Sequence, residues 1–149
     1  MWDDPNRVLL EKTFTRVWWI ALALMGSLFV EAIVIELVAG VVPLPGFTDP
    51  ENELSPNIRY ILLVLAVSDA LFLPFLRRRL LTVQNKASPK ILIARLQATS
   101  IVTLAISSFP AWMGMVIFLL WMYRGPFYFL WVFSLVLLLA YFPRKHFWL

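Results

Sequence analysis

The chain has 149 residues, of which 61% are hydrophobic and 15% charged, and its 13 basic and 9 acidic side chains give a formal net charge of +4. Soluble domains are about half apolar and a quarter charged, so this composition excludes a water-soluble globular fold. The charges gather in short stretches between long uncharged runs, which is typical of membrane spans. The basic excess therefore indicates membrane topology, and we expect no nucleic-acid partner.

The scarcity of two residue types excludes several kinds of site. The chain has no cysteine and a single histidine, which excludes disulfides, thiolate metal sites and bis-histidine haem ligation within the chain. We expect no cofactor and no bound metal. The first apolar run starts only at Val17 and is about 26 residues long, which argues against a cleavable signal peptide.

Residues 1–16 are predicted to form a short amphipathic helix on the cytoplasmic membrane surface. Asp3 and Asp4 precede Pro5, and this order is typical of a helix start. Apolar and charged side chains then alternate at near-helical spacing. The alternative is a frayed tail, because chain termini are often poorly held.

Residues 17–149 are predicted to form a transmembrane domain with four spans, at about 17–42, 58–76, 96–123 and 127–142. Prolines and a glycine at 43–46 end the first span, and a tight turn at 124–126 separates the last two. About 20 residues cross the hydrocarbon core, so the first and third spans can tilt and the fourth is just long enough. The predicted fold is all-α, with two antiparallel hairpins.

The basic residues predict how these spans are oriented. Eleven of the thirteen fall on one side, against Arg59 and Arg124 on the other. The positive-inside rule places the basic side and both termini in the cytoplasm, and the acidic 43–57 loop outside. The run Arg77, Arg78 and Arg79 is predicted to anchor the second span, with anionic-lipid binding as the alternative. The expected location is a bacterial inner membrane.

Two acids near the middle of spans are the most informative polar residues. Glu31 and Asp69 differ in predicted depth by only ~5 Å, so antiparallel first and second spans could bring them together. Each acid costs roughly 2.5–3.5 kcal/mol on insertion, and no basic residue lies at that depth. Each is therefore expected to be protonated, to share a proton, or to meet a cation or another subunit's basic group. Glu36 is predicted to be solvated near the outer interface.

These acids allow two interpretations. The functional one is a proton- or sodium-binding site, and the structural one is a pair of neutral acids that hydrogen-bond to hydroxyls on neighbouring helices. Small and hydroxyl side chains at steps of four residues predict close helix packing and supply such partners: Ala23 and Ser27 in the first span, and Thr99, Thr103, Ser107 and Ala111 in the third. Pro110 is predicted to kink the third span.

The sequence of the third span resembles that of a known kind of membrane protein. Its run RLQATSIVTLAISSFPAWMGMVIFLL, residues 95–120, resembles small bacterial membrane proteins built like two proteolipid hairpins, similar to the ATP synthase c subunit. The resemblance implies that Glu31 is an ion-carrying carboxylate. The glycine-repeat helix of the c subunit has no counterpart here, because only Gly26, Gly40 and Gly114 lie in or near the spans. A tightly packed rotor ring is therefore not expected.

The sequence favours a role as a subunit of an assembly over a role as an enzyme. It holds no phosphate-binding loop, no metal-ligand set, and no nucleophile with a histidine base inside a span. We expect a non-catalytic accessory or assembly subunit of a larger bacterial membrane complex, in contact with the bilayer, with bound lipids and with other membrane subunits. The alternative is a proton- or sodium-translocating protein that uses Glu31 and Asp69.

Overall fold

The computed structural model describes residues 4–41, 54–81 and 88–144, and the four elements in them are all helices. In chain order they are α1 (Asp4–Val41), α2 (Leu54–Leu81), α3 (Pro89–Trp121) and α4 (Arg124–Ala140). Helices α1, α2 and α3 are each long and apolar enough to cross a membrane, and α4 is a shorter apolar helix of 17 residues. The all-α prediction is confirmed, and the chain is compatible with a membrane protein.

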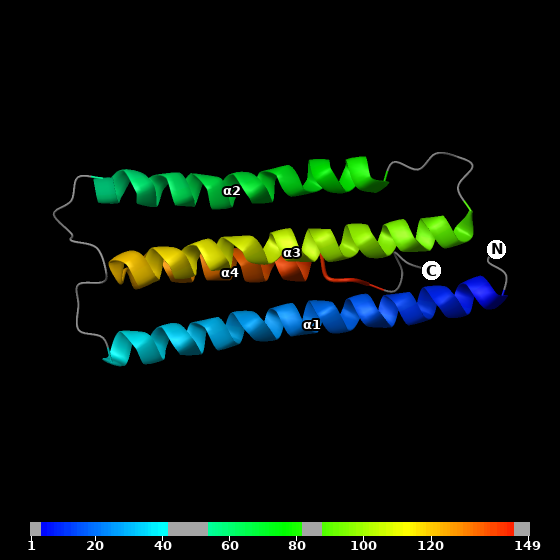
Figure 1. Cartoon of the computed structure of the whole chain (residues 1–149), viewed down its shortest axis with the longest axis horizontal. Helices are drawn as coiled ribbons and strands as arrows, with labels where there is room; N and C mark the ends of the chain where they lie inside the picture. The colour runs from blue at the N-terminus through cyan, green and yellow to red at the C-terminus, as the bar shows by residue number, and fades with distance from the viewer. Residues whose placement is uncertain (1–3, 42–53, 82–87, 145–149) are drawn as a thin grey trace.

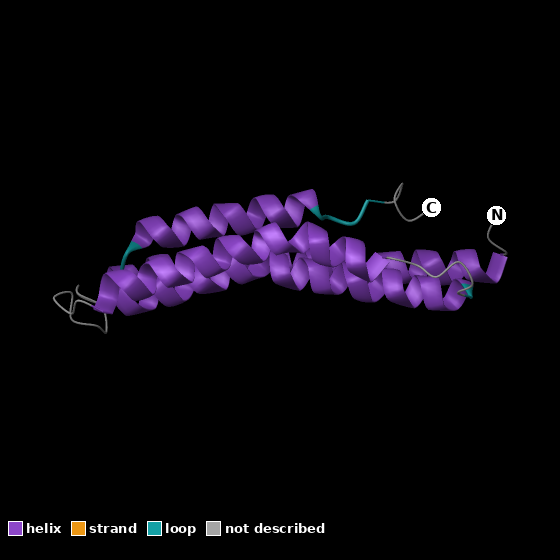
Figure 2. Cartoon of the chain, turned by 90° about the horizontal axis from the view of Figure 1, so that it is seen from above, coloured by secondary structure: helices purple, strands orange, loops and turns teal. Residues whose placement is uncertain are grey.

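Helix α3 is the centre of the arrangement. It packs against each of the other three helices, with α1 on one side and α2 on the other (Figure 1). Helices α1, α3 and α2 thus form a layer, and α4 covers one face of it, against α3 and α1 (Figure 2). The first and second helices were expected to be direct neighbours in a hairpin, but α3 lies between them.

Helix α1 continues through the boundary that the sequence suggested at residue 16. The segment predicted as a separate surface helix forms the first turns of α1, because no proline lies between Pro5 and Pro43 to interrupt it. Along its length α1 buries one stripe at steps of three, four or seven residues, as expected for a helix packed on one side: Leu10, Thr13, Val17, Ala21, Leu28, Glu31 and Ile35.

The turn between α3 and α4 lies earlier than the sequence indicated. Helix α3 ends at Trp121, and Met122 adopts a left-handed conformation with φ 56°, its N–H donating to the Phe118 carbonyl. Arg124, expected in the turn with the glycine and proline that follow it, begins α4 instead. Proline is tolerated in the first turn of a helix because its missing N–H would have no partner there.

The buried core lies mainly between α1, α3 and α4. One apolar cluster joins Leu28 of α1 to Ala111 and Leu138, and a second joins Ile35 to Phe118 and Phe127. Helix α2 contributes much less. Among its side chains that the structure describes, only Ala66 and Leu73 are buried, while most large apolar ones point outward, as lipid-facing residues do.

Candidate functional site: two acids on opposite sides of helix α3

Glu31 lies on the buried stripe of α1 and faces the core. Its side chain is 8% exposed, and neither carboxyl oxygen has a hydrogen-bond partner among the described residues. The neighbours one turn away, Leu28 and Ile35, both pack against α3 and α4. An acid at this position costs free energy that nothing in the described chain repays.

The hydroxyls expected to bind this acid are bonded within their own helix. Thr103 donates to the Thr99 carbonyl at 2.7 Å, and Ser107 donates to the Thr103 carbonyl at 2.8 Å. Ser27 donates to the Leu24 carbonyl in the same way. Such bonding to the preceding turn is common for Ser and Thr in membrane helices, and it leaves the Glu31 carboxyl without the partners that the structural interpretation supplied.

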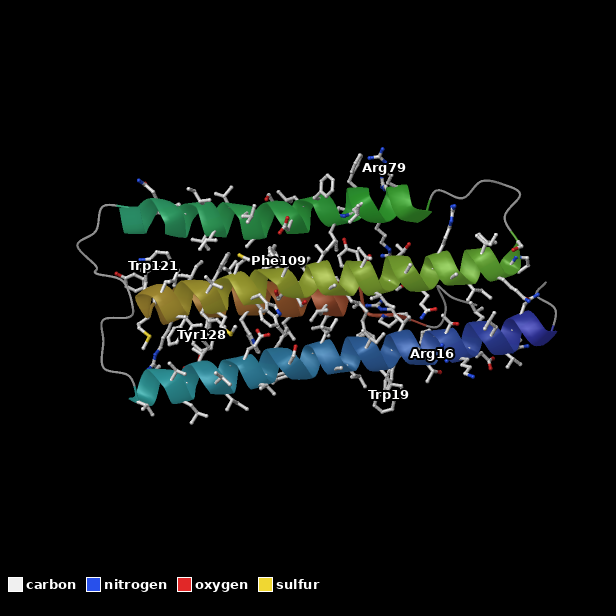
Figure 3. The ribbon with its side chains drawn as sticks, viewed as in Figure 1. Arg16, Trp19, Arg79, Phe109, Trp121 and Tyr128 are labelled. Carbon is white, nitrogen blue, oxygen red and sulfur yellow. The ribbon has the colours of Figure 1, made fainter. Side chains whose placement is uncertain are left out.

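Asp69 lies on the other side of the central helix. It is half-buried and lines a cavity of about 370 Å³ between α2 and α3, with Phe72, Leu73, Leu76, Ala105, Ile106 and Phe109. Figure 3 shows Phe109 pointing from α3 toward α2. Because α3 separates α1 from α2 (Figure 1), the structure does not bring Asp69 and Glu31 together. Similar depth in the membrane does not bring two acids together when another helix fills the space between them.

Glu36 is exposed, and in addition to being open to solvent it is paired. Its carboxylate accepts a hydrogen bond from the Tyr128 hydroxyl and lies 3.3 Å from a guanidinium nitrogen of Arg124. Both partners belong to the first turns of α4, four residues apart, and Figure 3 shows Tyr128 between α4 and α1. Glu36 and Arg124 are half-exposed, so the pair contributes at most about 1 kcal/mol. The sequence held a signal for this pair, because Arg124 is one of only two basic residues predicted on the side of the membrane toward which Glu36 lies.

Helices α3 and α4 are joined where Pro110 interrupts the bonding of α3. The Ser134 hydroxyl of α4 accepts a hydrogen bond from the Ala111 N–H at 2.9 Å. One turn later, a Cβ on Gly114 would lie 3.2 Å from both the Phe127 Cα and the Leu130 Cβ. The two backbones therefore approach closely at a glycine, as in other close-packed membrane helices. Neither Gly114 nor Ser134 was singled out by the sequence.

The residues predicted for close helix packing are buried in α3 and only partly so in α1, where Ser27 is half-buried. The α3 members are all buried: Thr99, Thr103, Ser107 and Ala111. Ala23 of α1 is exposed, because it lies two residues, about 200°, around the helix from the buried Ala21. One hydrogen bond between α1 and α4 is made by Trp131, whose indole N–H donates to the Leu28 carbonyl at 2.7 Å.

The arginines at the end of α2 lie inside the helix. Arg77 places its guanidinium 5.4 Å from the centre of the Tyr141 ring, a cation–π contact with the segment that follows α4. Arg78 and Arg79 are exposed, and Arg79 points away from the other helices (Figure 3). Pro74 is likewise interior to α2.

The described part of the chain has no group of three or more potential metal ligands. Its polar chemistry is thus carried by separate acids, each in a different surrounding. Comparison of the chain with protein-family models, with curated proteins and with solved structures finds no match.

Proposed function

We propose that this chain is a non-catalytic accessory or assembly subunit of a larger protein complex in a bacterial inner membrane. The observation that carries the proposal is the position of α3 between the helices that hold Glu31 and Asp69. A path for ions that used both carboxyls would need them in reach of one another or of a common channel. Here Glu31 is enclosed in the core, and Asp69 lines an apolar cavity between α2 and α3. This arrangement favours binding of a neighbouring protein over ion transport.

The proposal includes four membrane crossings with both chain ends in the cytoplasm. Its support is that α1 begins, α2 ends and α3 begins at one end of the molecule, whereas α1 ends, α2 begins and α3 turns into α4 at the other (Figure 1). The helix segments at the first end carry most basic residues of the described helices: Arg7, Lys12, Arg16, Arg77, Arg78, Arg79, Lys90 and Arg95. Helix α4, at ~25 Å, is short for a crossing but sufficient in a locally thinned bilayer.

Purification at native expression level tests the main proposal. A tagged chain, extracted into mild detergent or directly into lipid nanodiscs, is expected to migrate on a native gel with other membrane subunits in fixed ratio, identified by mass spectrometry. A lone monomer would contradict the proposal.

Reporter fusions test the topology separately. A periplasm-active phosphatase should be active after the 43–53 loop and inactive at both termini, and activity at either terminus would contradict the orientation.

A second candidate function is proton or sodium binding by Glu31. The observation that favours it is the enclosed carboxyl without a hydrogen-bond partner among the described residues, since such groups in membranes are often functional. Carbodiimide should then label Glu31 at neutral pH, and sodium should slow the labelling if the site takes that ion. Unchanged proton and sodium flux in liposomes that contain Glu31→Gln with Asp69→Asn would remove this candidate.

A further inference from the structure

The cavity between α2 and α3 combines an apolar lining with one acid at mid-span. Asp69 lies in the middle of the apolar stretch Tyr60–Arg79 of α2. It shares a face of that helix with Phe72, Leu73 and Leu76, at steps of three, four and seven residues. Across the cavity, α3 presents Ala105, a small and exposed residue that allows another helix to come near.

Asp69 has no hydrogen bond or ion pair with any described residue, although it is only half-exposed. Lipid tails cannot compensate a carboxyl at this depth, and lipid headgroups lie half a bilayer away. A second copy of the chain cannot supply a cation either, because no Lys, Arg or His occurs in 60–76, 96–123 or 125–143, nor between residues 17 and 58. A basic side chain that pairs with Asp69 at this depth would therefore belong to a different protein.

We propose that this cavity, on the α2 side of α3, receives a membrane-spanning helix of a different protein that carries one Lys or Arg near its middle. The inference rests on the proposed function as a subunit and names the chemistry of the partner. A pair of opposite charges within the membrane gives more binding specificity than an apolar surface does. A partner without the matching charge would leave the carboxyl unpaired, which is costly there. The long stem of Lys or Arg can pass the apolar lining while its charged end reaches the carboxyl.

A synthetic helix tests the inference without knowledge of the partner. The full chain, labelled with a donor dye at its C-terminus, is reconstituted in phosphatidylcholine liposomes with acceptor-labelled 20-residue Leu/Ala helices. One peptide carries a central Lys and its control a central Leu. Energy transfer should show an affinity for the Lys peptide about tenfold higher, and Asp69→Asn should abolish that preference.

Two further variants separate charge from shape and from global damage. Glu31→Gln removes the other mid-span acid, on the opposite side of α3, and should leave the preference for Lys intact. Ala105→Phe fills the cavity with Asp69 still present, and should weaken binding of the Lys peptide even if Asp69→Asn does not fold. Equal binding of the two peptides by the original chain, or a preference that survives Asp69→Asn, would overturn the inference. A preference lost in Glu31→Gln alone would also overturn it.

Failure of the inference can be told apart from failure of the proposed function. If the native complex purifies intact with Asp69→Asn and the two peptides bind equally, the chain is a subunit but its partner does not pair with Asp69. If the original chain purifies alone, the subunit proposal itself fails.

Discussion

Toward α4, helix α3 presents small side chains, and the two backbones come so close that a Cβ on Gly114 would meet Phe127 at 3.2 Å. Toward α2, the same helix leaves a cavity of about 370 Å³. Membrane helices lack a hydrophobic drive to associate, since lipid is as apolar as their side chains, so close packing and hydrogen bonds hold them together. The α4 side has both features, which suits a permanent contact between α3 and α4. The α2 side has a cavity instead, which suits exchangeable binding of the partner helix proposed above.

The largest expected effect breaks the close side. Gly114→Leu would push side-chain atoms into the backbone of α4 and should lower the free energy of unfolding by about 3 kcal/mol. Denaturant titration of helicity in mixed micelles measures it. Gly26→Leu is the matched control, because a Cβ there meets nothing within 4 Å, and it should cause no loss. Equal losses in the two variants would mean that the approach at Gly114 does not hold α4.

The next effect has the opposite sign. Glu31→Leu replaces an enclosed acid without a described partner by an apolar group, and should raise the free energy of unfolding by about 1–2 kcal/mol. Glu36→Leu should instead lower it by about 0.5 kcal/mol, because Glu36 is paired with Arg124 and Tyr128. The same micelle titration serves both. Destabilisation by Glu31→Leu would show that the acid binds something, as the ion-binding candidate requires.

A smaller loss is expected from the bond at the proline. Ser134→Ala removes the acceptor for the Ala111 N–H and should cost about 1 kcal/mol. If the proline creates the need for this bond, the cost should shrink when Ser134→Ala is made in a Pro110→Ala chain, and a double-mutant cycle measures the difference. An undiminished cost would separate the bond from the proline. Ser68→Ala, at an exposed hydroxyl on α2, is the control and should cost nothing.

The smallest effect probes the open side. Phe72 of α2 is 56% exposed and lines the cavity. Phe72→Ala should change the free energy of unfolding of the isolated chain by less than about 0.5 kcal/mol, because lipid replaces the lost contacts. In the native complex the same change should speed subunit exchange, measured by mixing labelled and unlabelled assemblies. A large loss in the isolated chain would mean that α2 is as firmly held as α4.

The sequence predicted the helices far better than their neighbours. Long apolar runs and breakers such as Pro43 specify which residues are helical. They do not specify which helices are neighbours, because the same apolar side chains can face either lipid or another helix. The expected pairing of Glu31 with Asp69 failed for that reason: α3 occupies the space between their helices.

The site was predictable only in part. Glu31 and Asp69 stand out in any reading, since acids in apolar runs are rare. The pairing of Glu36 with Tyr128 depends on where α4 begins. The turn before α4 was hard to locate from the sequence, because its left-handed residue is Met122 and not the glycine usual at such a position. Gly114 and Ser134 are ordinary in composition, and only the approach of two backbones gives them their role.

Helices α1 and α3 are longer than a bilayer is thick. At about 1.5 Å per residue their 38 and 33 residues span ~57 and ~50 Å, against ~30 Å of hydrocarbon. Figure 1 shows both of them extending beyond α2 and α4 at the end where α1 and α3 begin. Leu10 and Ile93 belong to the same buried cluster there, so the extension has its own packing. Arg16 and Arg95 belong to these two packed helices, so a change in the tilt of α1 and α3 would move both arginines together.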